Sequence, residues 1–375
     1  MINIVMFSNY PNNHVNPLCD ALSHVDGVNF AFVGSVDDVD EEKIKMGFLG
    51  NVSFPYVTIN KDKDQAYCYL QEADLIIYGD GDPKLVQSLM KDDAVVFQYS
   101  EHFSKNINPL KLVLKKIHHY YLFHAFDKRG GYLLATSSYA KGDFSSSCLY
   151  RHKALYWGYF PLGNMNEDLS DKKISKDAPI KLLWAERLVG FKRVEYAVKA
   201  ADILFRNKIP FELEIVGDGE KMAFLKSMLA DKPYLGSVKI SGRQDNAYVL
   251  NKMKEDDVFL FTSDKGEGWG AGLNEAMSSK CVVLASSLAG STAFLVKDGV
   301  NGYTFNDDEE YEKKLLLIAK ERGTDQLLAD NAYMNVKETW NAQVAAKNLV
   351  MLYIDIKKGV ELTPSIEPMP GKLIA

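Results

Sequence analysis

Glycines and carboxylates gather in residues 266–277, whose sequence is GEGWGAGLNEAM. Two of these residues are the carboxylates Glu267 and Glu275, eight positions apart. Glycines let a backbone approach a ligand closely, and the free N–H groups at a helix start attract a phosphate. We expect Glu267 in a loop and Glu275 about one turn into the following helix, where both can accept hydrogen bonds from sugar hydroxyls. A glycine-rich turn with two solvated carboxylates is the alternative.

Residues 184–193 could supply the matching positive charge. They contain Arg187 and, five positions later, Lys192, just after an apolar run that is typical of a strand. Arginine can pair with two phosphate oxygens, and lysine adds a point charge. Solvated side chains at a helix start are the alternative.

The elements that must position these residues alternate along the chain. Short apolar runs bounded by polar residues indicate parallel strands buried on both faces. In the first half we expect strands at 2–7, 28–33, 75–78, 94–99 and 132–135, and helices at 16–24 and 109–126. In the second half we expect strands at 180–185, 211–216, 238–241, 258–262, 281–285 and 303–305, with a helix at 342–357.

This alternation predicts an α/β protein with two doubly wound, Rossmann-like domains. Residues 158–179, rich in turn formers, are the linker candidate. We therefore predict an N-terminal domain over 1–160, joined by the C-terminal segment 342–375, and a C-terminal domain over 161–341. Open α/β sheets bind ligands at the carboxyl ends of their strands, so we expect the two domains to face a cleft.

Composition excludes several other classes. The chain has 375 residues, 47% hydrophobic and 25% charged, which is the usual globular mix. Its 44 basic and 50 acidic residues give a net charge of −6, which argues against general nucleic-acid binding. The four cysteines form no C-x-x-C pair, so a disulfide framework or zinc site is disfavoured and a reducing compartment is favoured. We found no signal peptide and no apolar run long enough to span a membrane, and expect a cytoplasmic protein.

Taken in order, the motifs of the second half resemble glycosyltransferase family four, whose members are retaining enzymes with the GT-B fold. The resemblance covers the whole C-terminal domain. It implies transfer of a sugar from a nucleoside diphosphate sugar, with UDP expected, to a hydroxyl of a glycan or lipid-linked acceptor in polysaccharide biosynthesis. The matching segments are WAERLVGFKR at 184–193, IVGDG at 215–219, VKISGR at 238–243, FTSDKGEGWG at 261–270, NEAM at 274–277, CVVLA at 281–285 and DGVNG at 298–302.

The resemblance also implies roles for the charged residues. Arg187 and Lys192 would neutralise the donor pyrophosphate. Glu275 would bind the ribose hydroxyls, and Glu267 would contact the donor sugar. The chain departs from the family at one position, because residue 186 is glutamate where glycine is usual. A carboxylate there could pair with Arg187 and weaken its phosphate role.

Further donor-binding residues follow from the same resemblance. The backbone at Gly268, Trp269 and Gly270 would meet the phosphates. Gly217 ends the next matching strand, and Arg243 would help to frame the base.

The first half resembles a capsule- and exopolysaccharide-type branch of the family. The resemblance rests on residues 9–17, 45–47, 99–102 and 156–161. It implies acceptor-side roles for His14 and His102, with Glu101 as a third candidate. Histidine is the side chain best poised near neutral pH, although a lone histidine is more often structural.

We predict no metal and no cofactor. Asp80 and Asp82 resemble aspartate pairs that hold a metal–nucleotide in glycosyltransferases of the other major fold. They follow a strand of the first domain, however, far from the donor motif, so a polar turn is the favoured interpretation. Arg187, Lys192 and the helix start would stabilise the leaving diphosphate instead.

Basic and aromatic residues are interleaved over residues 105–129, around the expected helix at 109–126. Such a helix can rest on an anionic membrane. Membrane-side acceptors in the family favour this contact, at the inner face of the cytoplasmic membrane. A buried helix with ordinary surface lysines is the alternative.

Two other functions stay open. A nucleotide-sugar epimerase of the same two-domain shape would isomerise its substrate without an acceptor. A non-catalytic sugar-nucleotide-binding partner would bind without turnover. An oxidoreductase is disfavoured because the first strand–helix turn lacks G-x-G-x-x-G.

Overall fold

The computed structural model describes residues 1–37, 52–105, 107–170, 172–174, 177–320, 322 and 325–375. The 45–47 motif lies outside these residues. The chain divides into two compact units, which we treat separately. Unit 1 comprises Met1–Pro161 and Thr339–Ala375, and unit 2 comprises Leu162–Glu338.

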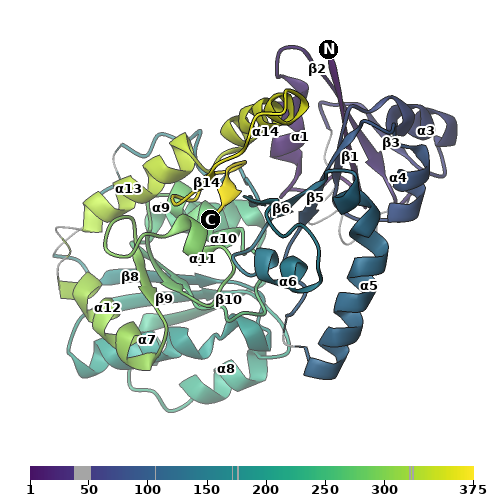
Figure 1. Cartoon of the computed structure of the whole chain (residues 1–375). Coiled ribbons are helices and arrows are strands. Elements are labelled where there is room, and N and C mark those ends of the chain that lie inside the picture. The colour runs from purple at the N-terminus through teal and green to yellow at the C-terminus, as the bar shows by residue number, and fades with distance from the viewer. Residues whose placement is uncertain (38–51, 106, 171, 175–176, 321, 323–324) are drawn as a thin grey trace. The chain divides into compact units, whose positions relative to one another are not determined.

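Unit 1 is built on a nine-stranded sheet with the order β14-β15-β7-β6-β5-β4-β1-β2-β3 (Figure 1). The paired strands are parallel except for β15, which runs antiparallel to β7. The strands are β1 (Ile2–Ser8), β2 (Val28–Gly34), β3 (Tyr56–Thr58), β4 (Leu75–Tyr78), β5 (Val95–Ser100), β6 (Tyr132–Ala135), β7 (Ala154–Tyr156), β14 (Pro364–Ser365) and β15 (Leu373–Ile374).

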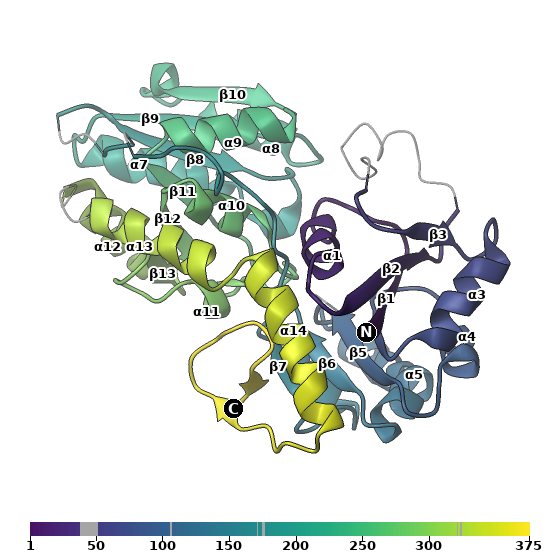
Figure 2. The same ribbon diagram turned by 90° about the horizontal axis from the view of Figure 1, so that it is seen from above.

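The helices of unit 1 begin where the local sequence favours a helix start. Asn108 accepts a hydrogen bond from the Leu110 N–H group at 3.0 Å, and Asn341 accepts one from Val344 at 2.9 Å, so each caps a helix. The capped C-terminal helix, α14, packs on α1 of the same unit (Figure 2). The helices are α1 (Asn16–Ser23), α3 (Lys63–Glu72), α4 (Pro83–Leu89), α5 (Pro109–Lys128), α6 (Ala140–Ser146) and α14 (Ala342–Lys357).

Unit 2 has a six-stranded parallel sheet with the order β10-β9-β8-β11-β12-β13. Helices α7, α8 and α12 cover one face, and α9, α10 and α13 cover the other (Figure 1). The strands are β8 (Ile180–Ala185), β9 (Phe211–Val216), β10 (Val238–Gly242), β11 (Val258–Phe261), β12 (Val282–Ser286) and β13 (Tyr303–Phe305). The helices are α7 (Glu195–Arg206), α8 (Met222–Leu229), α9 (Asn246–Glu255), α10 (Gly272–Ser278), α11 (Thr292–Leu295), α12 (Asp308–Lys320) and α13 (Asp325–Glu338), with short 3-10 turns at Gly190–Lys192 and Leu235–Ser237.

Strand order reverses beside the first strand of each unit. In unit 2 the chain moves outward from β8 through β9 and β10, then returns to the other side of β8 with β11. In unit 1 the same reversal falls between β1 and β4. Loops diverge at such a point and leave room for a ligand at the carboxyl ends of the strands.

The predicted fold class is confirmed, because both units are doubly wound α/β folds with mainly parallel sheets. Every expected strand is present, with ends that differ by one residue at most. The short strands β3, β7, β14 and β15 were missed, whereas β13, which also has only three residues, was predicted. Among the residues described, no helix is both long and apolar enough to cross a membrane.

Candidate functional site

In unit 2, the loops after β8 and β11 are tied together at the strand reversal. The Thr262 hydroxyl donates to the Lys192 carbonyl at 2.7 Å and accepts from the Trp184 indole N–H at 2.9 Å. The Asp264 N–H group donates to the Phe191 carbonyl at 2.8 Å. These ties bring two segments that are far apart in sequence into one site.

Lys192 is buried between two carboxylates at this junction. Its ammonium nitrogen lies 2.5 Å from Glu186 Oε2 and also forms an ion pair with Glu267 Oε2. Ser263 donates a second hydrogen bond to Glu267 Oε2, at 3.0 Å. Burial by itself would lower the pKa of Lys192, but the two carboxylates raise the pKa above its usual value. Lys192 is therefore a fixed positive charge that is only 5% exposed.

Sequence analysis did not predict that Glu186 would contact Lys192. The sequence suggested that Glu186 could pair with Arg187, but the structure pairs it with Lys192. Arg187 is instead exposed and makes no side-chain hydrogen bond or ion pair to any described residue. It thus remains available to a ligand.

Only one of the two carboxyl oxygens of Glu186 has a partner among the described residues. Its Oε1 atom is buried without a hydrogen-bond partner among the residues that the structure describes. A Cβ atom built on Gly272, at the start of α10, would lie 3.6 Å from this oxygen. Burial raises the pKa of Glu186, and Glu267 raises it further, against the opposing effect of Lys192.

Glu275 lies in the first turn of α10, as the sequence predicted. Burial and the nearby charge of Glu186 raise the pKa of Glu275 to about 7, although a hydrogen bond from the Asn246 side chain opposes this shift. Glu186 is therefore coupled both to Glu267, with which it shares Lys192, and to Glu275.

Two glycines of the donor motifs cannot carry a side chain. Gly217 has a φ of +144°, and a Cβ atom there would lie 1.9 Å from the Glu186 carbonyl oxygen. Gly270 has a φ of +83°, and its Cβ would lie 2.4 Å from the Phe261 ring. Gly217 thus lets the loop after β9 pack on the loop that carries Glu186, and Gly270 shapes the turn into α10.

The remaining predicted donor residues are divided between core and surface. The Trp269 side chain is fully buried, and its indole N–H donates to Asn274 Oδ1 at 2.7 Å. The Trp269 side chain is therefore part of the core. Only the backbone of Trp269 is left to contact a ligand. Gly268 is buried as well, whereas Arg243 is exposed directly after β10.

In unit 1, the structure brings His14 and Glu101 together through Tyr159. The His14 and Tyr159 rings stack with centroids 5.1 Å apart. The Tyr159 hydroxyl donates to Glu101 Oε1 at 2.9 Å, and Lys105 pairs with Glu101 Oε2. We call these four residues the unit 1 cluster. Sequence analysis missed Tyr159, although it lies in the 156–161 motif.

His102 lies in a different environment from Glu101, its neighbour in sequence. It is 3% exposed, its Nδ1 atom lies 2.9 Å from the Ser137 hydroxyl, and its ring packs on Tyr139. The structure therefore groups Glu101 with His14 and directs His102 toward the loop after β6.

The Asp80–Asp82 segment forms a turn and a helix cap. Asp80 accepts a hydrogen bond from the Gly81 N–H group at 2.8 Å, and Asp82 accepts one from Lys84 at 2.9 Å. The latter bond caps α4. Across the described ranges, no group of three or more histidine, cysteine or acidic side chains could hold a metal ion.

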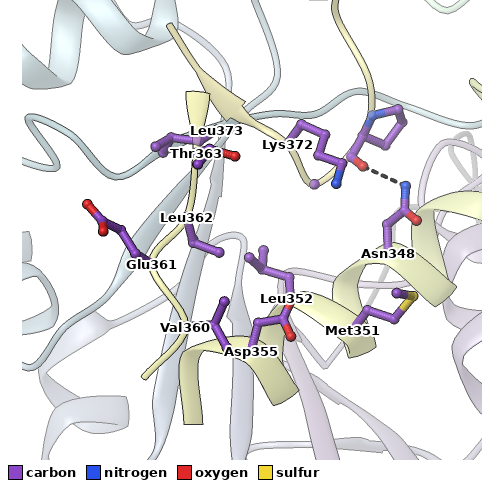
Figure 3. Close-up of a pocket in the computed structure, with 12 residues that line it drawn as sticks. Asn348, Met351, Leu352, Asp355, Val360, Glu361, Leu362, Thr363, Lys372 and Leu373 are labelled. Atoms are coloured by element: carbon purple, nitrogen blue, oxygen red, sulfur yellow. Dashed lines mark hydrogen bonds between the residues drawn. The ribbon is translucent and has the colours of Figure 1, made fainter. Parts of the chain in front are cut away.

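A pocket of about 230 Å³ lies between α14 and the C-terminal tail of unit 1 (Figure 3). Asn348 points across it and donates a hydrogen bond to the Pro370 carbonyl at 2.8 Å. None of the predicted site residues lines this pocket. The Asn348 bond ties α14 to the tail that supplies β14 and β15.

Solved structures of glycosyltransferases share this fold. A glycosyltransferase from Rickettsia africae matches with a TM-score of 0.68 and 13% identity, over 95% of this chain and 99% of the other. HepE from Anabaena, solved with UDP, matches with a TM-score of 0.66 and 15% identity, over 95% of this chain and 100% of the other. The two units therefore have the fold of GT-B glycosyltransferases.

The sequence comparisons point to glycosyltransferases as well. Residues 165–335 match the family described as Glycosyl transferases group 1. An uncharacterized glycosyltransferase of Methanocaldococcus jannaschii is 28% identical over 189 residues, which are 49% of this chain and 47% of the relative. The N-acetylglucosaminyltransferase GtfA subunit of Streptococcus pneumoniae is 22% identical over 256 residues, which are 67% of this chain and 48% of the relative. The chain thus spans about half the length of these curated relatives.

Proposed function

We propose that the protein is a retaining glycosyltransferase that moves a sugar from a UDP-sugar to a hydroxyl of a glycan or lipid-linked acceptor. The observation that carries this proposal is the buried Lys192, held at the strand reversal of unit 2 among the residues of the donor motif. HepE has been solved with UDP and with UDP-glucose, which supports a uridine donor. The GtfA subunit is named for UDP-N-acetylglucosamine, which points the same way.

On the donor side, the reaction develops negative charge on the leaving diphosphate. Lys192 and the exposed Arg187 would stabilise this charge, and the backbone at Gly270 would contact the phosphates. Glu275 would accept hydrogen bonds from the ribose hydroxyls, and Glu267 would contact the sugar. Because side chains supply the positive charge, we expect turnover to survive EDTA.

On the acceptor side, the unit 1 cluster fits a sugar hydroxyl best. Glu101 and His14 offer polar atoms, and the Tyr159 ring offers an apolar face between them. His102 is buried against Ser137 and Tyr139, so the geometry favours His14 and Glu101 for contact with an acceptor.

A panel of nucleotide sugars, scored for hydrolysis and thermal stabilisation, tests the proposal. A donor at about 100 times its Kd should stabilise the folded state by roughly 2.7 kcal/mol. We expect a UDP-sugar to stabilise the protein and to be hydrolysed slowly without acceptor. Isomerisation of the sugar without acceptor would instead support an epimerase, and binding without any turnover would support a non-catalytic partner.

We also propose that α5 rests on an anionic membrane, where a lipid-linked acceptor would be found. Leu112, Phe123 and Phe126 face the core of unit 1. A second row of apolar side chains points to solvent with helical spacing: Leu110 (78% exposed), Val113 (54%), Leu114 (68%), Ile117 (49%) and Tyr121 (68%). Lys111, Lys115 and Lys116 lie on the same helix, so an exposed apolar stripe is accompanied by positive charge.

Vesicle sedimentation tests this contact. The protein should bind phosphatidylglycerol vesicles more strongly than phosphatidylcholine vesicles, and salt should weaken the binding. Leu114→Glu should lower binding more than tenfold, since burying one leucine contributes about 1.5–3 kcal/mol. The matched control is Leu327→Glu on α13, where the wild-type side chain is 64% exposed. Equal loss of binding in both variants would contradict the role of α5.

A further inference from the structure

Lys192 already has two carboxylate partners before any donor arrives. Glu186 and Glu267 both pair with its ammonium group, and the side chain is nearly sealed from solvent. A donor diphosphate that uses Lys192 must therefore share it with these carboxylates or displace one of them. Of the two, Glu267 is the better held, because Ser263 also donates to its Oε2 atom.

Charge balance makes the ionised form of Glu186 unfavourable beside a donor. Glu186 and Glu267 meet at Lys192, and the charge of Glu186 also acts on Glu275. The other cations of the same loop are the exposed Arg187 and Arg193, whose guanidinium lies over the Tyr196 ring. A nucleoside diphosphate sugar brings further negative charge into this partly dry region, where repulsion between like charges is strong. One carboxylate must lose its charge or move into water.

Movement of Glu186 is restricted by its surroundings. Its Oε1 atom is buried near Gly272, and its backbone carbonyl packs so closely on Gly217 that no side chain fits there. Within the described structure, its Oε1 atom also lacks any donor that would stabilise the negative charge, whereas Asn246 donates to Glu275. A carboxyl group in this position relieves the repulsion most directly by binding a proton.

We propose that Glu186 holds Lys192 in the donor-free protein and takes up a proton from solvent when the donor diphosphate replaces it on Lys192. The inference rests on the proposed function, since it requires a diphosphate at this site. Once protonated, the Glu186 carboxyl group carries an O–H that can donate to a phosphate oxygen, so the residue changes from a competing anion into a hydrogen-bond donor. Burial, which favours the neutral carboxyl group, makes this proton uptake less costly.

Proton-linked calorimetry with UDP tests the inference. Binding enthalpies are measured in buffers of different ionisation enthalpy between about pH 7.5 and 9, where the phosphates of free UDP are fully ionised. We expect the wild-type protein to take up close to one proton per UDP bound and to bind UDP more weakly as the pH rises. Glu186→Gln should abolish the uptake and flatten the pH dependence. At pH 9 it should also bind UDP at least about 30-fold more tightly than the wild-type protein, because uptake of one proton weakens wild-type binding about tenfold for each pH unit of this range.

Two further variants serve as controls for the Glu186→Gln result. Glu186→Ala should also abolish the proton uptake, which covers the case in which the amide of the Glu186→Gln variant distorts the site. Glu220→Gln removes an exposed carboxylate from the neighbouring loop after β9 and should leave the uptake unchanged. Unfolding curves of each variant show whether unit 2 is folded.

The outcomes separate this inference from the proposed function. UDP binding without proton uptake, or uptake that survives Glu186→Gln and disappears in Glu275→Gln, would overturn the inference and leave the donor site intact. Failure of the folded wild-type protein to bind UDP or any other nucleoside diphosphate would contradict both.

Discussion

The two candidate sites are built on opposite physical principles, although each lies at the carboxyl ends of a doubly wound sheet. In unit 2, Lys192 is buried between carboxylates, so its charge is fixed and shielded from water. In unit 1, His14 and Tyr159 stack as rings, and the ion pair of Glu101 with Lys105 is partly exposed. A buried charge suits recognition of a charged diphosphate, whereas stacked rings beside partly exposed hydrogen-bonding groups suit a sugar hydroxyl. The contrast supports a donor role for unit 2 and an acceptor role for unit 1.

The largest expected effect comes from removing the central charge of unit 2. Lys192→Ala should lower turnover by roughly a hundredfold to a thousandfold, as loss of one preorganised charge does. It should also destabilise unit 2 by about 3–5 kcal/mol, because two buried carboxylates lose their partner. Initial rates and urea unfolding measure the two effects.

Arg187→Ala is the matched test of the exposed cation. Because Arg187 makes no side-chain hydrogen bond or ion pair within the described structure, its loss should lower turnover and leave unfolding nearly unchanged. Near wild-type turnover in both variants would mean that unit 2 does not bind a diphosphate in this way.

The next effect concerns pH and the carboxyl group of Glu275. Its pKa is about 7 in the folded protein, against an ordinary value of 4.5. Between these two pH values the unfolded chain has released a proton that the folded protein still holds, so stability falls as the pH rises through this window. The loss is complete above about pH 7 and amounts to roughly 3 kcal/mol.

Glu275→Gln cannot ionise and should remove this loss. The variant should be close to wild type near pH 4.5 and more stable than wild type at pH 8, with a difference of up to about 3 kcal/mol in urea unfolding. Glu309→Gln, an exposed change on α12 of the same unit, is the control and should follow the wild-type profile. Parallel profiles for Glu275→Gln and wild type would show that this carboxyl group ionises normally.

Sequence patterns predicted the strands and loops that carry both sites, because the spacing of apolar residues depends on local secondary structure. Apolar runs located the strands, and the positions of Lys192 and Glu267 after β8 and β11 follow from those runs. The pairing of Lys192 with Glu186 could not be read in this way. Both residues lie in one loop, and only the path of that loop past Gly217 decides which cation Glu186 meets.

The unit 1 cluster shows a second limit of sequence analysis. His102 and Glu101 are adjacent in sequence, and nothing in that pattern shows that their side chains have different partners. Tyr159 joins the cluster from 58 positions away, so only the folded chain reveals the contact. Helix α5 was predicted within two residues, yet its separate buried and exposed apolar rows appear only once the core is known.

A smaller effect should distinguish the two histidines of unit 1. His14→Ala should lower transfer to the acceptor by about tenfold, the value of one ring stack or hydrogen bond, and leave donor hydrolysis unchanged. His102→Ala should mainly destabilise unit 1, because it removes a buried ring and its bond to Ser137. Rates of transfer and of hydrolysis, measured beside thermal unfolding, make the distinction. Selective loss of transfer in His102→Ala alone would reverse our assignment.

The smallest expected effect isolates one hydroxyl group of the unit 1 cluster. Tyr159→Phe keeps the ring that stacks on His14 and removes the O–H that donates to Glu101 at 2.9 Å. A hydrogen bond to a carboxylate contributes about 1.5–3 kcal/mol when buried, and the partial exposure of Glu101 reduces this to about 1 kcal/mol. Lys105 still holds the other oxygen of Glu101, so the carboxylate should loosen but remain in place. We therefore expect a severalfold higher KM for the acceptor, an unchanged KM for the donor and a nearly unchanged kcat. Tyr150→Phe is the matched control, since the Tyr150 hydroxyl donates at 2.8 Å to Gln98 Oε1 in the core of the same unit. It should lower stability without changing either KM. If the two variants raise the acceptor KM equally, the rise in KM results from altered packing of unit 1, and the unit 1 cluster does not bind the acceptor.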